Sequence, residues 1–135
     1  MPTGLHIFTD GSCKDGRGSW AYVVIRDGGV IAEASGWQAR TNSLHMEFRA
    51  AIEALRSLPP ESSATLSSDS RILVDAMKRV GKPLTAAQHQ DEIQVLFSLD
   101  AKHQIVWRWV KAHAGNVYNE RCDELCVAAR TGINI

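Results

Sequence analysis

LHIFTDGS, residues 5–12, opens the chain with a short apolar run that is typical of a β-strand. The run breaks at Asp10, where Gly11 and Ser12 favour a turn. An acid is therefore expected at the end of the first strand. Three more acids stand at the edges of other predicted elements: Glu47, Asp69 and Asp123.

The residues that follow predict an antiparallel meander. A second strand is expected over residues 20–25 and a returning strand over residues 30–37. Between them, residues 26–29 (RDGG) favour a tight hairpin, because Asp-Gly and Gly-Gly pairs tolerate positive φ angles. The first third of the chain should thus form three adjacent strands.

From Leu44 onward, apolar residues at helical spacing alternate with short strands. Four helices are expected: from Leu44 to the prolines at 59–60, from after Asp69 to residues 81–83, over about 86–99, and over 118–130. Two strands are expected between them, at 64–68 and 105–110. The order β-β-β-α-β-α-α-β-α predicts an α/β fold with a mixed sheet and helices on its faces. The last strand is apolar on both faces, which suggests a central strand with Trp107 and Trp109 in the core.

Size and composition fit one domain over residues 1–135, with 44% hydrophobic and 22% charged residues. No apolar run reaches the roughly 18 residues that a membrane helix needs, and no leader opens the chain, so we expect a cytoplasmic protein without membrane contact. Three cysteines argue against a disulfide framework. Cys122 and Cys126 share a helical face and are expected in the core.

The charge balance predicts weak, salt-sensitive binding to any nucleic acid. Fifteen basic and fifteen acidic residues give a net charge of zero, and the basic residues are scattered. Bound divalent ions would add positive charge at the acids.

Each acid alone has an ordinary explanation. Asp10 could be a turn residue, Asp69 could cap a helix, and Asp123 could belong to a solvated helix face. Glu47 fits these roles less well, because the third position of a capping box that begins at Ser43 is Met46. Their shared position at element ends favours convergence, since sites form at the carboxyl ends of strands.

Acids crowded together repel one another unless a cation binds them. Oxygen ligands select magnesium or manganese over zinc. Two such ions about 4 Å apart support in-line attack on a phosphodiester, so the residues predict a metal-dependent nuclease. His113, in the loop before the last helix, suits proton transfer at neutral pH.

Five segments closely resemble bacterial type 1 ribonuclease H (ribonuclease HI): residues 7–13 (IFTDGSC), 46–47 (ME), 68–70 (SDS), 110–115 (VKAHAG) and 119–125 (NERCDEL). They occur in the family's order and span about residues 5–130. The resemblance implies a ribonuclease H-like fold with a five-stranded sheet. It also implies cleavage of the RNA strand of RNA–DNA hybrids, leaving 5′-phosphate and 3′-hydroxyl ends. Two Mg²⁺ ions, or Mn²⁺ in their place, would be bound by Asp10, Glu47, Asp69 and Asp123, with Asp10 bridging, while His113 would assist protonation or product release.

The same resemblance implies the substrate contacts. Main-chain groups of Gly11, Ser12 and Cys13, with Glu47, would lie near RNA 2′-hydroxyls. Arg40 and Thr41 are similar to the family's DNA-phosphate pocket, Asn42 begins the segment where the family has paired asparagines, and Arg71 stands where glutamine is common. The family's basic, tryptophan-bearing protrusion is reduced or absent at residues 78–88.

Two alternatives remain beside a monomeric ribonuclease H. One is another nuclease of the same fold, and the other is a non-catalytic or weakly active module that binds hybrids. A binding module has no need to retain four mutually repelling acids, so the acids favour an enzyme.

Overall fold

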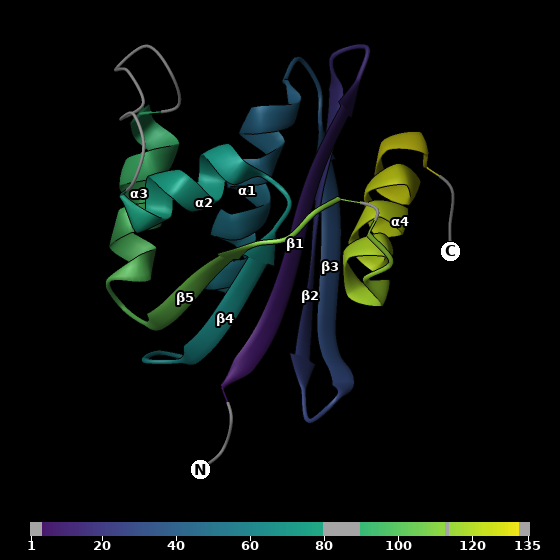
Figure 1. Ribbon diagram of the computed structural model, residues 1–135. Helices are drawn as coiled ribbons and strands as arrows, with labels where there is room; N and C mark the ends of the chain where they lie inside the picture. Colours follow the sequence, from purple (N-terminus) through teal and green to yellow (C-terminus); the bar gives the residue numbers. More distant parts are fainter. Residues whose placement is uncertain (1–3, 80–89, 113, 133–135) are drawn as a thin grey trace.

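A five-stranded mixed sheet organises the molecule, with strand order β3-β2-β1-β4-β5 (Figure 1). The computed structural model describes residues 4–79, 90–112 and 114–132. Its strands are β1 (Leu5–Lys14), β2 (Arg17–Arg26), β3 (Gly29–Gln38), β4 (Ser63–Ser68) and β5 (Gln104–Trp109). β1, β2 and β3 pair antiparallel, whereas β1–β4 and β4–β5 pair parallel. The predicted fold class is confirmed.

Two tight hairpins build the meander. Asp15 and Gly16 join β1 to β2 with φ angles of 53° and 77°, and Asp27 and Gly28 join β2 to β3 with φ angles of 51° and 78°. Two successive positive φ angles match the twist of the flanking strands, and aspartate and glycine adopt them at low cost. The hairpin predicted at residues 26–29 is confirmed.

Four helices complete the described part of the chain: α1 (Ser43–Arg56), α2 (Arg71–Lys78), α3 (Gln90–Asp100) and α4 (Val117–Thr131). The N-cap of α2 is Ser70, whose hydroxyl accepts the Leu73 N–H at 3.3 Å. The capping role considered for Asp69 therefore belongs to its neighbour. α2 ends at Lys78 with Arg79 as a left-handed C-cap, so the helix stops before the predicted residues 81–83. The predicted helical residues 86–89 lie outside the described residues.

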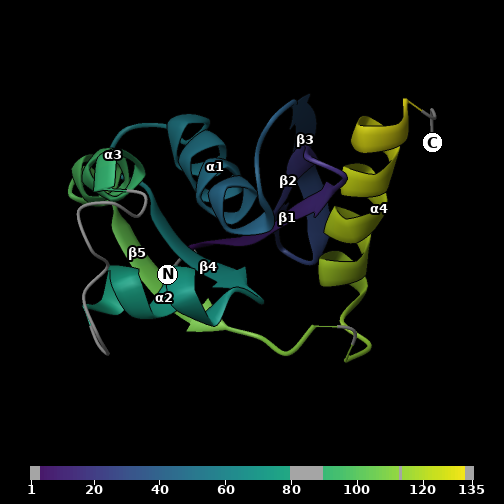
Figure 2. The same cartoon turned by 90° about the horizontal axis from the view of Figure 1, so that it is seen from above.

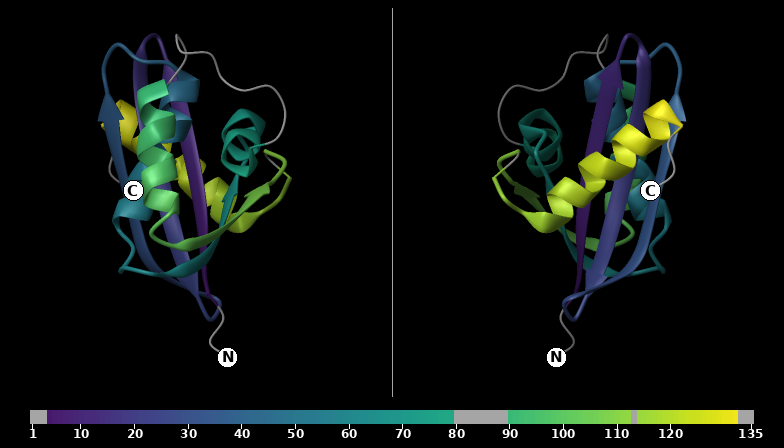
Figure 3. Two further views of the ribbon diagram at one scale, coloured as in Figure 1. Left: turned by 90° about the vertical axis from the view of Figure 1, so that its left-hand side faces the viewer. Right: turned by 90° about the vertical axis from the view of Figure 1, so that its right-hand side faces the viewer.

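Helices cover both faces of the sheet, as the view from above shows (Figure 2). The larger core joins α1, α2 and α3 to β1, β4 and β5 through fully buried side chains such as Phe48, Leu66 and Leu96. α4 lies obliquely across the strands on the opposite face (Figure 3), where Cys122 and Cys126 pack against Phe8. The predicted core role of both cysteines is confirmed.

The last strand departs from the prediction. β5 lies at the edge of the sheet and not in its centre, and Val106 is 64% exposed. Trp107 is buried, and its indole N–H donates to Asp100 Oδ1 at 2.9 Å. Trp109 is 39% exposed, so its prediction as a core residue was wrong. It is the last residue of the strand.

The described helices are short compared with a bilayer. The longest, α4, has 15 residues, whereas a membrane span needs about 20 mostly apolar ones. Within the ranges that the structure describes, no helix meets that requirement.

Candidate active site

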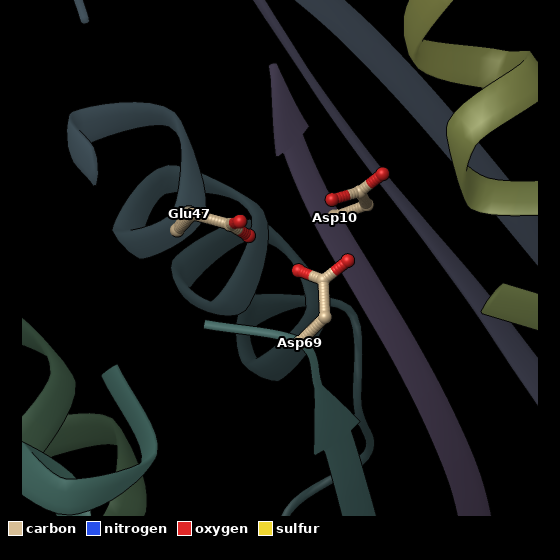
Figure 4. A group of neighbouring side chains, drawn as sticks. All are labelled: Asp10, Glu47 and Asp69. Atoms are coloured by element: carbon tan, nitrogen blue, oxygen red, sulfur yellow. The ribbon is translucent and has the colours of Figure 1, made fainter. Parts of the chain in front are cut away.

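Three acids from different parts of the chain meet at one end of the sheet (Figure 4). Asp10 belongs to β1, Glu47 to the first turns of α1, and Asp69 to the connection between β4 and α2. One carboxylate oxygen from each lies within 4.8 Å of the other two. Their side chains point toward one another in the close-up view.

Strand pairing explains why Asp10 and Asp69 are neighbours. β1 and β4 run parallel, and Thr9 is the register partner of Ser68. The next residue in each strand's sequence is an acid, so Asp10 and Asp69 lie at the same level. Asp69 follows the end of β4, whereas Asp10 lies inside β1, which continues to Lys14. The carboxyl end of β4 is thus a site-forming edge, as predicted for Asp69. The predicted end of the first strand at Asp10 was wrong, because the turn comes later, at Asp15 and Gly16.

Gly11 explains how Glu47 joins them. A β-carbon at Gly11 would lie 2.4 Å from both the Glu47 nitrogen and the Met46 carbonyl carbon, closer than real side chains approach. Glycine therefore lets β1 pass directly against the first turns of α1. The same contact places the carboxylate of Glu47 beside that of Asp10.

Burial and mutual repulsion raise the pKa values of Asp10 and Glu47. Burial, the charge of Asp69 and the charge of Asp123 together raise the pKa of Asp10 to about 8, although the Gly11 N–H opposes this by donating to Asp10 Oδ1 at 3.0 Å. Burial also raises the pKa of Glu47 well above its usual range, and the charges of Asp10 and Asp69 add to the effect. The ionised cluster is thus unfavourable without a cation.

The donor set fits a hard divalent cation. All three residues offer carboxylate oxygen, the ligand that magnesium and manganese prefer. Glu47 Oε1 is buried and has no hydrogen-bond partner among the described residues. A buried acceptor without a donor is costly, and a bound cation would satisfy it.

Asp123 lies on α4, half-buried, and is not a member of the close group of three. It is near enough for its charge to raise the pKa of Asp10. The helix is held to β1 around it: Cys122 Sγ donates to the Phe8 carbonyl at 3.3 Å, and Cys126 Sγ donates to the Asp10 carbonyl at 3.4 Å. The helix that carries Asp123 is therefore packed directly against the strand that carries Asp10.

The predicted substrate contacts surround this group unevenly. Gly11, Ser12 and Cys13 continue β1 and are partly exposed. Cys13 Sγ donates to the Thr41 carbonyl at 3.4 Å, which ties the end of β1 to the loop before α1. Thr41 is partly buried, and its Oγ1 has no hydrogen-bond partner among the described residues.

The remaining predicted contacts have varied settings. Arg40 is exposed with a φ of 56°. Asn42 is the N-cap of α1, and its side chain accepts the His45 N–H at 2.8 Å. Arg71 is exposed at the start of α2. The role predicted for His113 lies outside the described residues.

Sequence reasoning missed one neighbour of the site. The Trp109 indole N–H donates to the Asp69 carbonyl at 3.1 Å. Its position as the last residue of a strand was the available signal, because a side chain at a strand end reaches the rim of the sheet. Because Trp109 alternates with Trp107 along the strand, the sequence pattern instead predicted both tryptophans in the core.

Comparison with known proteins gives consistent results. The family model described as RNase H matches residues 2–131. Ribonuclease HI of Synechocystis sp. is 38% identical over 141 residues, covering 95% of this chain and 88% of that protein. Ribonuclease H of Rhizobium meliloti is 38% identical over 144 residues, covering 96% of this chain and 90% of that protein. A crystal structure of LC11-RNase H1 in complex with an RNA/DNA hybrid has a TM-score of 0.84 at 19% identity. The match covers 95% of this chain and 97% of that one.

Proposed function

The chain belongs to the RNase H family and is a ribonuclease H, and from this premise we propose that it hydrolyses the RNA strand of RNA–DNA hybrids by a two-metal-ion mechanism. The products would carry 5′-phosphate and 3′-hydroxyl ends. The observation that supports the mechanism is the group formed by Asp10, Glu47 and Asp69, whose oxygens lie within 4.8 Å of one another.

Asp10, Glu47, Asp69 and Asp123 would hold the metal ions, Mg²⁺ by preference or Mn²⁺ in its place. When bound, the ions supply an activated water and neutralise charge on the phosphate and the leaving oxygen. Asp10 would be a central ligand of this set, because one of its oxygens lies within 4.8 Å of oxygens of Glu47 and Asp69. Asp10 is buried and Glu47 and Asp69 are half-buried, which would limit the movement of these ligands.

Proton release is part of this proposal. Asp10, with a pKa of about 8, holds a proton at neutral pH in the metal-free protein. A dication favours the ionised carboxylate, so binding would expel that proton. Apparent metal affinity should therefore rise with pH up to about 8. His113 would move a proton to or from the reacting groups, as its loop position and imidazole chemistry allow.

The remaining residues would recognise the hybrid. Main-chain groups of Gly11, Ser12 and Cys13 border the acids from β1, where they can reach the 2′-hydroxyls that distinguish RNA from DNA. Arg40, Thr41 and Asn42, in and next to the loop before α1, would contact the DNA strand. The hybrid seen with LC11-RNase H1 supports this class of substrate.

The proposal includes a single catalytic domain over residues 1–135, a monomeric state and a cytoplasmic location. Limited proteolysis, sedimentation and cell fractionation test these three points separately.

The direct test is cleavage of an end-labelled RNA–DNA hybrid in Mg²⁺, with double-stranded RNA and branched DNA as comparison substrates. We expect cleavage of the RNA strand of the hybrid alone, with products that accept ligation at their 5′-phosphates. Asp10→Asn should lower the rate by about a thousandfold, as loss of a central electrostatic group does. Equal rates for wild type and Asp10→Asn would exclude the proposed site, and preferential cutting of branched DNA would favour another nuclease of this fold.

A further inference from the structure

Trp109 links the end of β5 to the acidic group. It pairs in register with Ser68 of β4, and the following Val110 N–H donates to the Ser68 carbonyl at 2.9 Å. The Trp109 indole N–H reaches the next residue, the Asp69 carbonyl, at 3.1 Å. The ring is therefore fixed beside the backbone of a proposed metal ligand, with 39% of the residue still exposed.

Arg71 lies on the face of that ring. Its guanidinium carbon is 4.2 Å from the centre of the Trp109 ring, within the range of a cation–π contact. Arg71 is the first residue of α2 and is exposed. One aromatic side chain thus contacts both the Asp69 backbone and the Arg71 side chain.

The guanidinium has unused hydrogen-bonding capacity. Across residues 4–79, 90–112 and 114–132, no carboxylate forms an ion pair with Arg71 and none of its donors has an acceptor. Arg49 and Arg121, in contrast, pair with Glu53 and Glu33 at 2.7 and 2.8 Å. Arg71 therefore keeps five donors for a ligand while its plane is held against the indole.

Such an arrangement suits a phosphate. Arginine binds phosphate through paired, charge-assisted hydrogen bonds, and stacking on Trp109 reduces the conformational freedom that binding would otherwise remove. Arg71 is two residues from Asp69, so their α-carbons are at most about 7 Å apart. Phosphates follow one another along a strand at about 3.4 Å of helix axis, which puts a neighbour of the reacting phosphate within reach.

We propose that Trp109 and Arg71 form a phosphate-binding subsite for the RNA strand, which holds a phosphate adjacent to the scissile one. Arg71 donates to the phosphate oxygens, and Trp109 is a positioning residue that orients Arg71. This inference rests on the proposed function, because the subsite positions the strand that the acids would cleave. It also supplies a positive contact in a chain whose net charge is zero.

Steady-state cleavage of a hybrid with one cut site tests the subsite through Arg71→Gln, Trp109→Leu, Trp109→Phe and the double variant Arg71→Gln/Trp109→Leu. We expect Arg71→Gln to raise KM about tenfold with little change in kcat, and to reduce the slope of log affinity against log salt by about one. Trp109→Leu should raise KM similarly, and the double variant should add little to either single change. Trp109→Phe keeps an aromatic face and should retain a KM near that of wild type.

Arg56→Gln is the matched control. Arg56 is exposed like Arg71, and its replacement by glutamine also removes one positive charge. Arg56 lies nine residues after Glu47 on α1, so the two residues are about 13 Å apart along the helix axis. Its KM and salt slope should equal those of wild type. A KM increase of the same size in Arg56→Gln would show a general charge effect and overturn the subsite.

Hybrids with a neutral methylphosphonate at one RNA position locate the contact. Neutralising the phosphate next to the cut should raise the wild-type KM about tenfold and leave that of Arg71→Gln unchanged. Equal effects on both proteins, or an Arg71→Gln variant with wild-type KM and salt slope, would overturn the inference. A Trp109→Leu variant that loses kcat alone would also overturn it, because Trp109 would then act only through Asp69. A wild-type chain that cleaves no hybrid would instead refute the proposed function.

Discussion

A β-carbon on Gly11 would lie 2.4 Å from the backbone nitrogen of Glu47. β1 and α1 are therefore in backbone contact at the point where one provides Asp10 and the other Glu47. The acidic group depends on this close approach, because it brings together residues that are 37 positions apart in the sequence.

Gly11→Ala should disrupt both stability and the site. The added methyl group must displace backbone, so we expect a loss of about 2–3 kcal/mol in the free energy of unfolding and at least a tenfold fall in kcat for hybrid cleavage. Gly29→Ala is the control, because its nearest neighbour, the Arg26 carbonyl oxygen, is 3.9 Å from the new β-carbon. In urea unfolding, the free energy of unfolding of Gly29→Ala should be within about 0.5 kcal/mol of that of wild type. Equal effects of the two variants would contradict the close approach.

Metal-free stability should fall as pH rises. The pKa of Asp10 is about 8 in the folded protein against 3.8 for the free group, so between these values the folded chain holds a proton that the unfolded chain has lost. The contribution of Asp10 to stability is then greatest below about pH 4 and decreases towards pH 8, by at most about 1.4 kcal/mol per pH unit.

Asp10→Asn isolates that contribution, because asparagine does not ionise. Urea unfolding in chelator at pH 4.5, 6 and 7.5 should give a flatter pH dependence for the variant than for wild type. Saturating Mg²⁺ should reduce the difference, since the cation stabilises the ionised form. Parallel curves in chelator would show that Asp10 titrates normally.

The three thiols should differ in reactivity. Burial raises the pKa of both Cys122 and Cys126 and removes them from solvent, whereas Cys13 is only partly buried. A thiol reagent should therefore modify one cysteine rapidly in the native protein and three in denaturant. Cys13→Ser should remove the rapid phase. Fast modification of a second thiol would indicate that α4 is not packed on β1 as described.

An ion pair between α4 and β3 should contribute modestly. Arg121 donates from Nη2 and Nε to the two carboxylate oxygens of Glu33, at 2.8 and 3.1 Å. The hydrogen bond from Arg121 lowers the pKa of Glu33, so its contribution is present above the usual glutamate pKa and is lost as pH falls below it. Because the pair is about one-third exposed, Glu33→Gln should cost no more than about 1 kcal/mol at pH 7 and nothing near pH 2.

Glu124→Gln provides the comparison, because Glu124 meets the same arginine at 3.3 Å but is 61% exposed. Its effect on thermal unfolding should be smaller than that of Glu33→Gln. The opposite order would mean that the link to β3 does not hold α4.

The sequence was sufficient for the order of the elements and for the neighbourhood of Asp10 and Asp69, but not for every boundary, since β1 continues past Asp10 and α2 ends at Lys78. Apolar periodicity located the strands, and parallel pairing of β1 with β4 follows from the crossover between them. Glu47 was harder to place from the sequence pattern alone, because its proximity to Asp10 depends on the backbone contact between β1 and α1 at Gly11. No local signal reports a contact of that kind.

The central placement predicted for β5 failed because strand order is a property of the whole sheet. An apolar strand was assigned to the centre, but β5 lies at the edge, and this left Trp109 exposed. Its bond to Asp69 and its stacking with Arg71 follow from that position.

Calorimetric titration of the metal-free protein with Mg²⁺ tests the central claim most directly. Wild type should bind the ion and release protons, and Asp10→Asn and Asp69→Asn should each lose at least tenfold in affinity. Asp91→Asn, which removes an exposed acid on α3, should bind like wild type. Binding by Asp10→Asn with wild-type affinity would contradict the assignment of these acids as the metal site.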